Sequence, residues 1–480
     1  MSAKVTANGS PVVVQEPLEP SAMLHRTPWR PPVAVSGQGI YVTLKDGRKI
    51  IDGAGGAAVT SIGNGHPEVV KAIQQQVGKL AYVYSMQMSN EPAEELAKTI
   101  IESSNGAFEL VGYLSGGSEA MEAVIKMGRQ YFLEVGQPQR TRYIARHLSY
   151  HGNTMGTLGL CDHPARKDAY MALLPSKEQN VYSYVSPAYY ARFKKEGETE
   201  EQYVQRLKEE LDAKFQEVGP ETVIGFVAET VVGATTGAVP PPKGYFKAMK
   251  EVCDKYGALF ILDEVMSGMG RMGTMHAWES FGDGVSPDLQ AVAKGLGGGY
   301  VSIGAILMSP RIAAGLRGGS NFWKHGHTYQ SHPIACAGAL AVQHVIKNEN
   351  LLDNCRKMGE LLESQLRSRL TGPNATSAPY VFDIRGGGLF WGIEFELGPL
   401  QEKMHKKFGP KVSFAALLSA RCFDNGLVIM GFNGGANIEG TKGEHILLAP
   451  AYNVTKDEVA AIVDIVVKST EDLIDEISKA

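Results

Sequence analysis

Two apolar segments end in ionisable residues that could together hold and activate a cofactor. The segment ALFILDEV carries Asp263 and Glu264 near its end, and the segment LQAVAKGLGGG presents Lys294 ahead of several glycines. A lysine amine condenses with an aldehyde to form an imine, and a carboxylate holds a pyridine nitrogen protonated, which makes the ring an electron sink. Asp263 and Lys294 therefore indicate a site for an aldehyde-bearing pyridine cofactor. Taken alone, the carboxylates could instead be a helix cap, and Lys294 could instead be a surface charge.

The stretch YLSGGSEAMEAVIK could bind the phosphate of such a cofactor. Ser115, Gly116, Gly117 and Ser118 follow an apolar run and precede an expected helix. A helix N-terminus attracts anions, glycines let backbone amides approach the anion, and Ser118 adds a hydroxyl. A helix cap without any ligand is an equally good interpretation of this stretch alone.

The segment HLSYHGNTMG supplies further candidate contacts to the same cofactor. Tyr150 could stack on a pyridine ring, Gly152 permits close approach, and His151 lies between them. A packed core tyrosine is the alternative for Tyr150. The histidines of the chain complete no spacing that is typical of zinc sites, so we expect no metal.

The glycines at 268–273, GMGRMG, match the GxGxxG pattern of dinucleotide-binding sites. That motif requires a helix that opens at the glycines, and the residues RMGTMHAW are a poor helix start. We therefore do not expect a nicotinamide cofactor at this stretch.

The pattern of apolar and amphipathic segments around these residues predicts a mainly parallel α/β sheet. Short apolar runs alternate with amphipathic helical patterns, and the runs cover residues 110–114, 143–145, 223–228, 258–262, 289–293 and 303–308. Strands this uniformly apolar are buried on both faces. Ligands of such sheets bind at the carboxyl ends of the strands, where Asp263 and Lys294 lie.

The flanking segments predict a second, smaller domain. An Asp-Gly pair at 46–47 predicts a hairpin, and later patterns predict helices at 333–347, 351–370 and 456–477 and a strand at 388–395. A chain of 480 residues is too long for one core. We therefore expect an extended, proline-rich arm at 1–34, a large domain at 81–335, and a small domain built from 35–80 and 336–480.

Composition limits the partners and the compartment. The net charge of −4, with both signs interspersed, leaves no basic face for nucleic acid, and no stretch is long and apolar enough to predict a membrane span. Five cysteines are scattered without a short CxxC spacing, which favours free thiols and a cytoplasmic location.

These motifs, in this order, closely resemble those of the class III (ω-type) aminotransferases, which have fold type I of the pyridoxal 5′-phosphate (PLP) enzymes. The matching stretches include SGGSEAMEAVIK, SYHGNTMG, LFILDEVMSGMGRMGT, AVAKGLGGGYVSIGA and HGHTYQSHP. The resemblance implies PLP as the cofactor. It also implies a large domain with a mainly parallel seven-stranded sheet and a small α+β domain.

The resemblance assigns roles to the residues that match the family's motifs. It implies that Lys294 forms the Schiff base, that Asp263 pairs with the pyridine nitrogen, and that Glu229 lies beside the cofactor. The remaining cofactor contacts would be Ser115, Gly116, Gly117, Ser118, Tyr150, His151, Gly152 and Val265, with Thr328 supplied by a neighbouring subunit. A homodimer would then be the minimum unit, with a tetramer as the larger alternative.

The chain departs from the family at positions that contact substrates. Leu447 and Met430 stand where relatives commonly carry carboxylate-binding arginines, and Ala58 stands where several amine-preferring members have a bulky aromatic residue. Arg385 matches a family arginine, but we expect it to tie the C-terminal domain together. These departures favour a roomy pocket and a large, apolar amine donor without an α-carboxylate.

The expected reaction is ping-pong transamination from a primary amine or ω-amino donor to a keto acid such as pyruvate. Lys294 would move a proton between the substrate carbon and the cofactor. The alternatives are an aminomutase, a racemase or a decarboxylase, because enzymes of one fold select the reaction through their substrate-side residues. The intact Lys294, Asp263 and Glu229 disfavour a non-catalytic relative.

Overall fold

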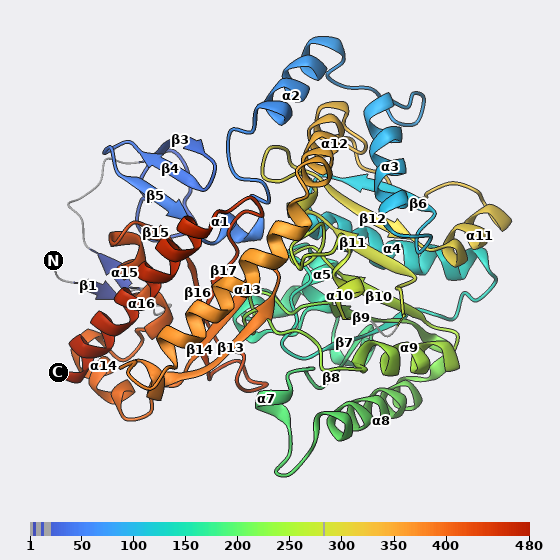
Figure 1. Ribbon diagram of the computed structural model, residues 1–480. Helices are drawn as coiled ribbons and strands as arrows, with labels where there is room; N and C mark the ends of the chain where they lie inside the picture. The colour runs from blue at the N-terminus through green and yellow to red at the C-terminus, as the bar shows by residue number, and fades with distance from the viewer. Residues whose placement is uncertain (1–2, 6–10, 14–20, 282–283) are drawn as a thin grey trace.

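The computed structural model describes residues 3–5, 11–13, 21–281 and 284–480. Its largest sheet has seven strands in the order β6-β12-β11-β10-β9-β7-β8 (Figure 1). These are β6 (Leu110–Leu114), β7 (Arg142–Arg146), β8 (Tyr182–Val185), β9 (Val223–Glu229), β10 (Leu259–Asp263), β11 (Leu289–Val292) and β12 (Gly304–Met308). Only β12 pairs antiparallel with its neighbours. The predicted seven-stranded, mainly parallel sheet is confirmed, although β8 was not predicted.

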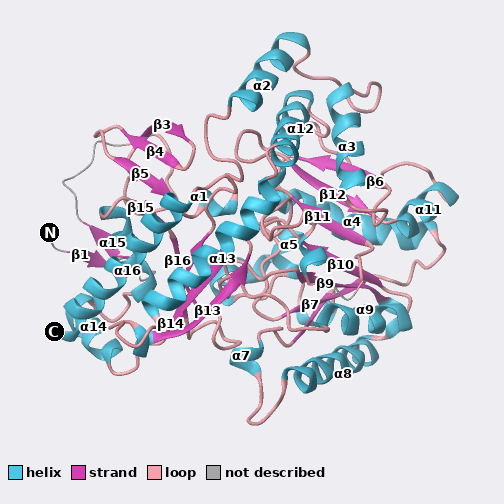
Figure 2. Ribbon diagram, in the orientation of Figure 1, coloured by secondary structure: helices cyan, strands magenta, loops and turns pink. Residues whose placement is uncertain are grey.

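Helices cover both faces of this sheet (Figure 2). Alternate side chains of β10 point to opposite layers, as the pleat of a strand requires. Leu259 and Ile261 pack with helix α4 (Gly117–Glu134), whereas Phe260 and Leu262 pack with α8 (Glu200–Val218) and α9 (Tyr245–Lys255). The central strands β9 to β12 are therefore buried along their whole length.

Two four-stranded sheets form the other half of the molecule. One has the order β15-β5-β4-β3, and the other has the order β13-β14-β17-β16. Their strands are β3 (Ala34–Gln38), β4 (Tyr41–Leu44), β5 (Lys49–Asp52), β13 (Val381–Gly387), β14 (Phe390–Phe395), β15 (Leu427–Val428), β16 (Met430–Asn433) and β17 (Glu444–Leu448). The predicted hairpin at 46–47 is confirmed, since it joins the antiparallel strands β4 and β5. Strand β15 pairs with β5, which ties the C-terminal part of the chain to its N-terminal hairpin.

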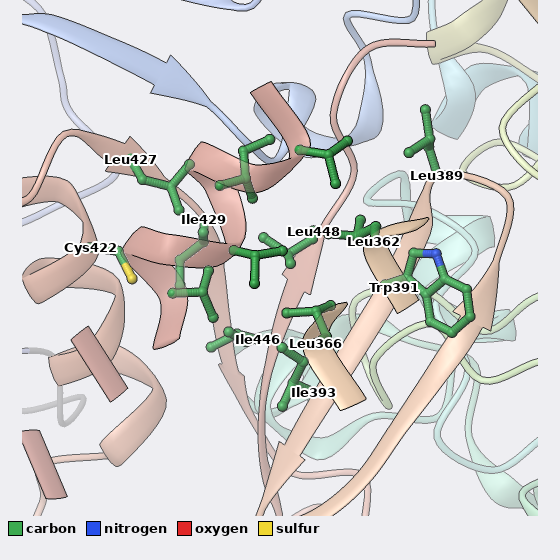
Figure 3. Packing of buried hydrophobic residues seen from close by; sticks show 14 of the residues in the cluster. Leu362, Leu366, Leu389, Trp391, Ile393, Cys422, Leu427, Ile429, Ile446 and Leu448 are labelled. Atoms are coloured by element: carbon green, nitrogen blue, oxygen red, sulfur yellow. The ribbon is translucent and has the colours of Figure 1, made fainter. Parts of the chain in front are cut away.

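The predicted helices of the C-terminal part are confirmed as α12 (Pro333–Asn348), α13 (Leu351–Leu370) and α16 (Lys456–Ser478). Helix α16 begins at a capping box formed by Thr455 and Glu458, which satisfies its first backbone amides. Leu362 and Leu366 of α13 pack with Ile393 of β14 and Ile446 of β17 in the core of this half (Figure 3).

Shorter elements complete the described chain. They are β1 (Ala3–Val5), β2 (Pro11–Val13), α1 (Gly55–Ala58), α2 (Pro67–Lys79), α3 (Glu91–Ser103), α5 (Met155–Leu160), α6 (Pro164–Lys167), α7 (Tyr190–Phe193), α10 (Ala277–Ser280), α11 (Pro310–Gly318), α14 (Leu400–Phe408) and α15 (Phe414–Asp424). Within the predicted arm, β1 and β2 form an antiparallel pair, whereas 1–2, 6–10 and 14–20 lie outside the described residues. No helix of the described chain is long and apolar enough to cross a membrane.

Helix α13 touches the turn between β13 and β14 through Gly359. A Cβ atom at Gly359 would collide with the backbone carbonyl oxygen of Gly388, and a backbone atom cannot move aside as easily as a flexible side chain. We expect Gly359→Ala to lower the free energy of unfolding by about 1–3 kcal/mol, as overpacking does, measured by chemical denaturation. Gly78→Ala in α2 is the matched control, because nothing lies within 4 Å of its Cβ position. Equal stability of the two variants would contradict the close packing of α13.

Candidate active site

A cavity of about 530 Å³ opens at the carboxyl ends of the central strands. This volume suits a small-molecule ligand. The cavity is lined by all the single-chain residues predicted to contact the cofactor, namely Ser115, Gly116, Gly117, Ser118, Tyr150, His151, Gly152, Glu229, Asp263, Val265 and Lys294. Thr328 does not line it: the residue is exposed, and its carbonyl oxygen accepts a hydrogen bond of 3.0 Å from the hydroxyl of Tyr82.

The register of the parallel strands brings the ionisable residues of this cavity together. Asp263 at the end of β10 lies opposite Glu229 at the end of β9. On its other side, Asp263 lies opposite Ala291 of β11, and Lys294 lies two residues beyond the end of that strand. Two carboxyl groups and one amine therefore line the same cavity at the same edge of the sheet.

The buried Asp263 carboxylate is held by two donors. Its Oδ2 lies 2.9 Å from Nδ1 of His151, and its Oδ1 accepts a hydrogen bond of 3.0 Å from the amide of Val265. A carboxylate only accepts hydrogen bonds, so Nδ1 of His151 carries the proton when Asp263 is ionised. Nε2 of His151 is buried and has no hydrogen-bond partner in the described chain. A carboxylate fixed in this way fits a protonated pyridine nitrogen as its remaining partner.

Glu229 lies next to Asp263 and is also buried. Its two carboxyl oxygens each accept a 3.0 Å hydrogen bond, one from the amide of Tyr150 and one from the amide of Gly233. Burial raises the pKa of Glu229, the charge of His151 opposes this effect, and the charge of Asp263 adds to it. The site therefore favours the neutral form of Glu229 more than water does.

Lys294 presents its amine to the cavity from an unusual backbone conformation. Its φ is +42°, a region that side chains other than glycine rarely adopt, and such strain concentrates at functional sites. Burial lowers the pKa of Lys294 to about 8, although the charges of Asp263 and Glu229 oppose the shift. A substantial fraction of the amine is therefore neutral near physiological pH, as a nucleophile and proton acceptor requires.

The start of α4 forms a cradle that fits a phosphate. A Cβ atom at Gly117 would collide with the side chain of Val265, and one at Gly152, whose φ is +138°, would press on Ser118. Both positions therefore require glycine, and they keep the backbone close to the positive end of an 18-residue helix. No side chain caps the first turn of α4 at its N-cap residue Gly116, although Glu119 accepts a hydrogen bond of 3.0 Å from the amide of Ser115.

Glu264, the other carboxylate of the ALFILDEV segment, has a different position. It does not line the cavity but accepts four hydrogen bonds of 2.8 Å, from the hydroxyl of Thr230, the amides of Ala277 and Trp278, and the side chain of Gln290. Burial raises its pKa to about 7 despite these donors. Glu264 holds the strand ends and α10 together, whereas Asp263 faces the ligand.

The GxGxxG match at 268–273 and the histidines of the chain lie in other structural settings. The glycines at 268–273 lie in turns and open no helix, and Gly270 and Gly273 pack closely against Tyr452 and Arg356. The histidines are dispersed: His147 pairs with Asp162, and His332 caps α12. In the described part of the chain, no group of three metal-ligating side chains is found.

The three positions that differ from or match arginines of the family have different surroundings in the structure. Met430 lines the cavity, and Leu447 is buried beside it in a small apolar cluster. Arg385 is engaged by Glu394 at 2.8 Å and by the carbonyl of Thr236, which confirms its expected structural role.

The expectation that Ala58 widens the substrate pocket stays a prediction. Ala58, at φ +59°, does not line the cavity itself but is buried in an apolar cluster with Val231 and Met430, which do line it. The neighbouring residues Ala57 and Val59 line the cavity in its place.

Two arginines of the cavity lining were not predicted. Arg26 comes from the segment that precedes β3, and Arg166 comes from the short helix α6. Neither belongs to a motif, and each reaches the cavity through tertiary structure alone. No periodicity or spacing in the sequence could have identified them.

Comparison with known proteins gives a consistent result. The family model described as Aminotransferase class-III matches residues 26–469. An uncharacterized aminotransferase of Schizosaccharomyces pombe is 42% identical over 441 residues, covering 92% of each chain. Gamma aminobutyrate transaminase 3, chloroplastic, of Solanum lycopersicum is 31% identical over 461 residues, covering 94% of this chain and 84% of that protein.

A solved structure of a transaminase is also similar to this chain over nearly its whole length. The omega transaminase of Pseudomonas jessenii in complex with PMP, the amino form of PLP, has a TM-score of 0.82 at 29% identity. The match covers 93% of this chain and 94% of that one. The chain belongs to the class III aminotransferases and is a PLP-dependent transaminase of fold type I.

Proposed function

We propose that this transaminase moves an amino group from a primary amine or ω-amino donor to a keto acid such as pyruvate, in two half-reactions of a ping-pong mechanism. The donor leaves as a carbonyl compound, and the keto acid leaves as an amino acid. The observation that carries the proposal is a buried amine, Lys294, beside Asp263 in a cavity that Met430 and Phe432 make partly apolar. The similarity to omega transaminases and to a gamma aminobutyrate transaminase supports such donors.

We assign the chemistry of the site to four residues. PLP, when bound, supplies an electron sink for the electrons of the broken C–H bond. Lys294 accepts the proton from the substrate carbon at Nζ, since its lowered pKa leaves part of the amine neutral, and then delivers this proton to the C4′ atom of the cofactor. Asp263 holds the pyridine nitrogen protonated, and the donors from His151 and Val265 keep its carboxylate in place.

The remaining residues position the cofactor and the assembly. Gly117 and Ser118 at the start of α4 hold the phosphate, and Tyr150 provides a flat aromatic surface for the ring. Thr328 completes the site of a second subunit, which makes a homodimer the active unit, and its exposure on this chain suits that role. The five cysteines are buried and unpaired, which supports a reducing, cytoplasmic location.

An amine-donor panel with pyruvate tests the proposed reaction. We expect an arylalkylamine to exceed glutamate in kcat/KM by about tenfold or more, because the second carboxylate of glutamate would lose its hydration beside apolar side chains such as that of Met430. Carbonyl product and alanine should form in equal amounts, and Lys294→Ala should lose both turnover and the visible absorbance of the lysine-bound cofactor. Consumption of a donor without a carbonyl product would instead support an aminomutase, racemase or decarboxylase.

The hydrogen bond between His151 and Asp263 can be tested by paired substitutions. His151→Leu removes a charge-assisted donor worth about 1.5–3 kcal/mol, so we expect kcat at saturating PLP to fall about 10- to 100-fold. His151→Asn retains an N–H group close to the position of Nδ1 and should recover much of that loss. Equal rates for the two variants would show that the donor does not support Asp263. The PLP dissociation constant, measured by absorbance, should be higher for His151→Leu than for His151→Asn.

The lowered pKa of Lys294 predicts a pH dependence that needs no substrate. In the cofactor-free protein, labelling of Lys294 by an amine-specific reagent should rise with pH, because only the neutral amine reacts, with a midpoint near 8. A free lysine would have its midpoint near pH 10.4. Peptide mass spectrometry across a pH series measures the labelled fraction, and the PLP-loaded protein is the control in which Lys294 should be protected. A midpoint near 10 would contradict the burial of this amine.

A further inference from the structure

Two guanidinium groups line the active-site cavity, and among the described residues neither has a carboxylate partner. Arg166 of α6 and Arg26 contribute to the same lining as Tyr150 and Lys294. The guanidinium carbon of Arg166 lies 5.2 Å from the centre of the Tyr150 ring. In the part of the chain that the structure describes, neither arginine side chain forms an ion pair. Two charges that face a ligand cavity in this way are available to an anionic ligand.

Both arginines act on the pKa of Tyr150, which lines the same cavity. Burial raises the pKa of Tyr150, whereas the charge of Arg166 and, more weakly, that of Arg26 act in the opposite direction. An arginine stays protonated over the whole pH range of an enzyme. The two arginines therefore contribute lasting positive charge beside Tyr150, while Met430 and Phe432 belong to an apolar patch.

The segment that carries Arg166 is fixed from both sides. Pro164 occupies the first turn of α6, and the neighbouring Lys167 is buried. The amine of Lys167 donates to the carbonyl oxygen of Cys161 at 2.7 Å and to the hydroxyl of Tyr184 at 3.0 Å. An anchored segment holds its guanidinium group in a defined place, which lowers the entropic cost of binding.

A keto-acid acceptor needs such a charge, because it always brings a carboxylate into the cavity. Leu447 and Met430 leave the positions of the usual arginines without a charge, and Arg385 is already paired with Glu394. In the described lining, Arg166 and Arg26 are the cationic side chains that remain besides Lys294 and the histidine bound to Asp263.

We propose that Arg166 binds the carboxylate of the keto-acid acceptor, with the exposed Arg26 as a second cation beside it. The planar guanidinium offers parallel N–H donors that match the two oxygens of a carboxylate. Arg166 is thus a specificity residue for the second half-reaction, and this assignment rests on the proposed function above. A donor amine without a carboxylate does not use it.

Separate measurement of the two half-reactions tests the assignment. We expect Arg166→Met to raise the pyruvate concentration that gives half of the maximal rate by about 10- to 100-fold, as loss of a charge-assisted hydrogen bond does. Arg166→Lys keeps the charge but loses the parallel N–H donors of the guanidinium group. Its half-saturating pyruvate concentration should lie between the values for Arg166→Met and the unsubstituted enzyme. Arg48→Met, at the exposed turn between β4 and β5, is the control for losing an arginine elsewhere. Cofactor absorbance, followed in stopped flow, reports each half-reaction.

A binding measurement adds a readout that does not depend on turnover. Propionate has the carboxylate of the acceptor but no reactive carbonyl, and calorimetry on the PLP-loaded protein should show weaker binding to Arg166→Met than to Arg48→Met. An unchanged pyruvate dependence, or unchanged propionate binding, would overturn the assignment. Loss of bound PLP from Arg166→Met would also overturn it, since Arg166 would then support Tyr150 and the cofactor. Failure of the proposed function is a separate result, in which no amine converts the cofactor of the unsubstituted enzyme.

Discussion

The parallel register of β9, β10 and β11 is the constraint on which the active site depends. It sets Asp263 opposite Glu229 and brings both close to Lys294, which lies two residues beyond the end of β11. A shift of β10 by one residue would exchange the faces of its side chains and turn Glu264 into the cavity in place of Asp263. The four hydrogen bonds to Glu264 oppose such a shift, because they tie that carboxyl to β11 and to α10.

Burial at the sheet edge also shifts the pKa values of the reactive groups. Removing charges from water raises the pKa of Glu229 and lowers the pKa of Lys294, so both groups move toward their neutral forms. A fully charged lysine beside two carboxylates would be held in a stable ion pair and would be a poor nucleophile. Backbone amides of Tyr150 and Gly233 stabilise Glu229 without adding a positive charge, which leaves the amine available for chemistry.

Much of this arrangement could be predicted from local patterns, and the failures have physical reasons. Continuous apolar runs identified the fully buried strands and the positions of Asp263 and Lys294. Strand β8 escaped because its residues Tyr182–Val185 are mostly only half-buried at the edge of the sheet, so no continuous apolar run marks it. That Ala57 and Val59 rather than Ala58 line the cavity depends on the non-helical backbone of α1, and backbone kinks leave no period in the sequence.

The cavity lining shows the limit of local patterns most clearly, because its arginines come from segments that carry no motif. Their position also explains how one cavity can serve two unlike substrates. Arg166 and Tyr150 form a charged part of the lining, whereas Met430 belongs to an apolar part. Under the assignment proposed for Arg166, an apolar amine would bind next to Met430, and the carboxylate of the acceptor would pair with the guanidinium group. No arginine would then have to move into or out of the cavity between the two half-reactions.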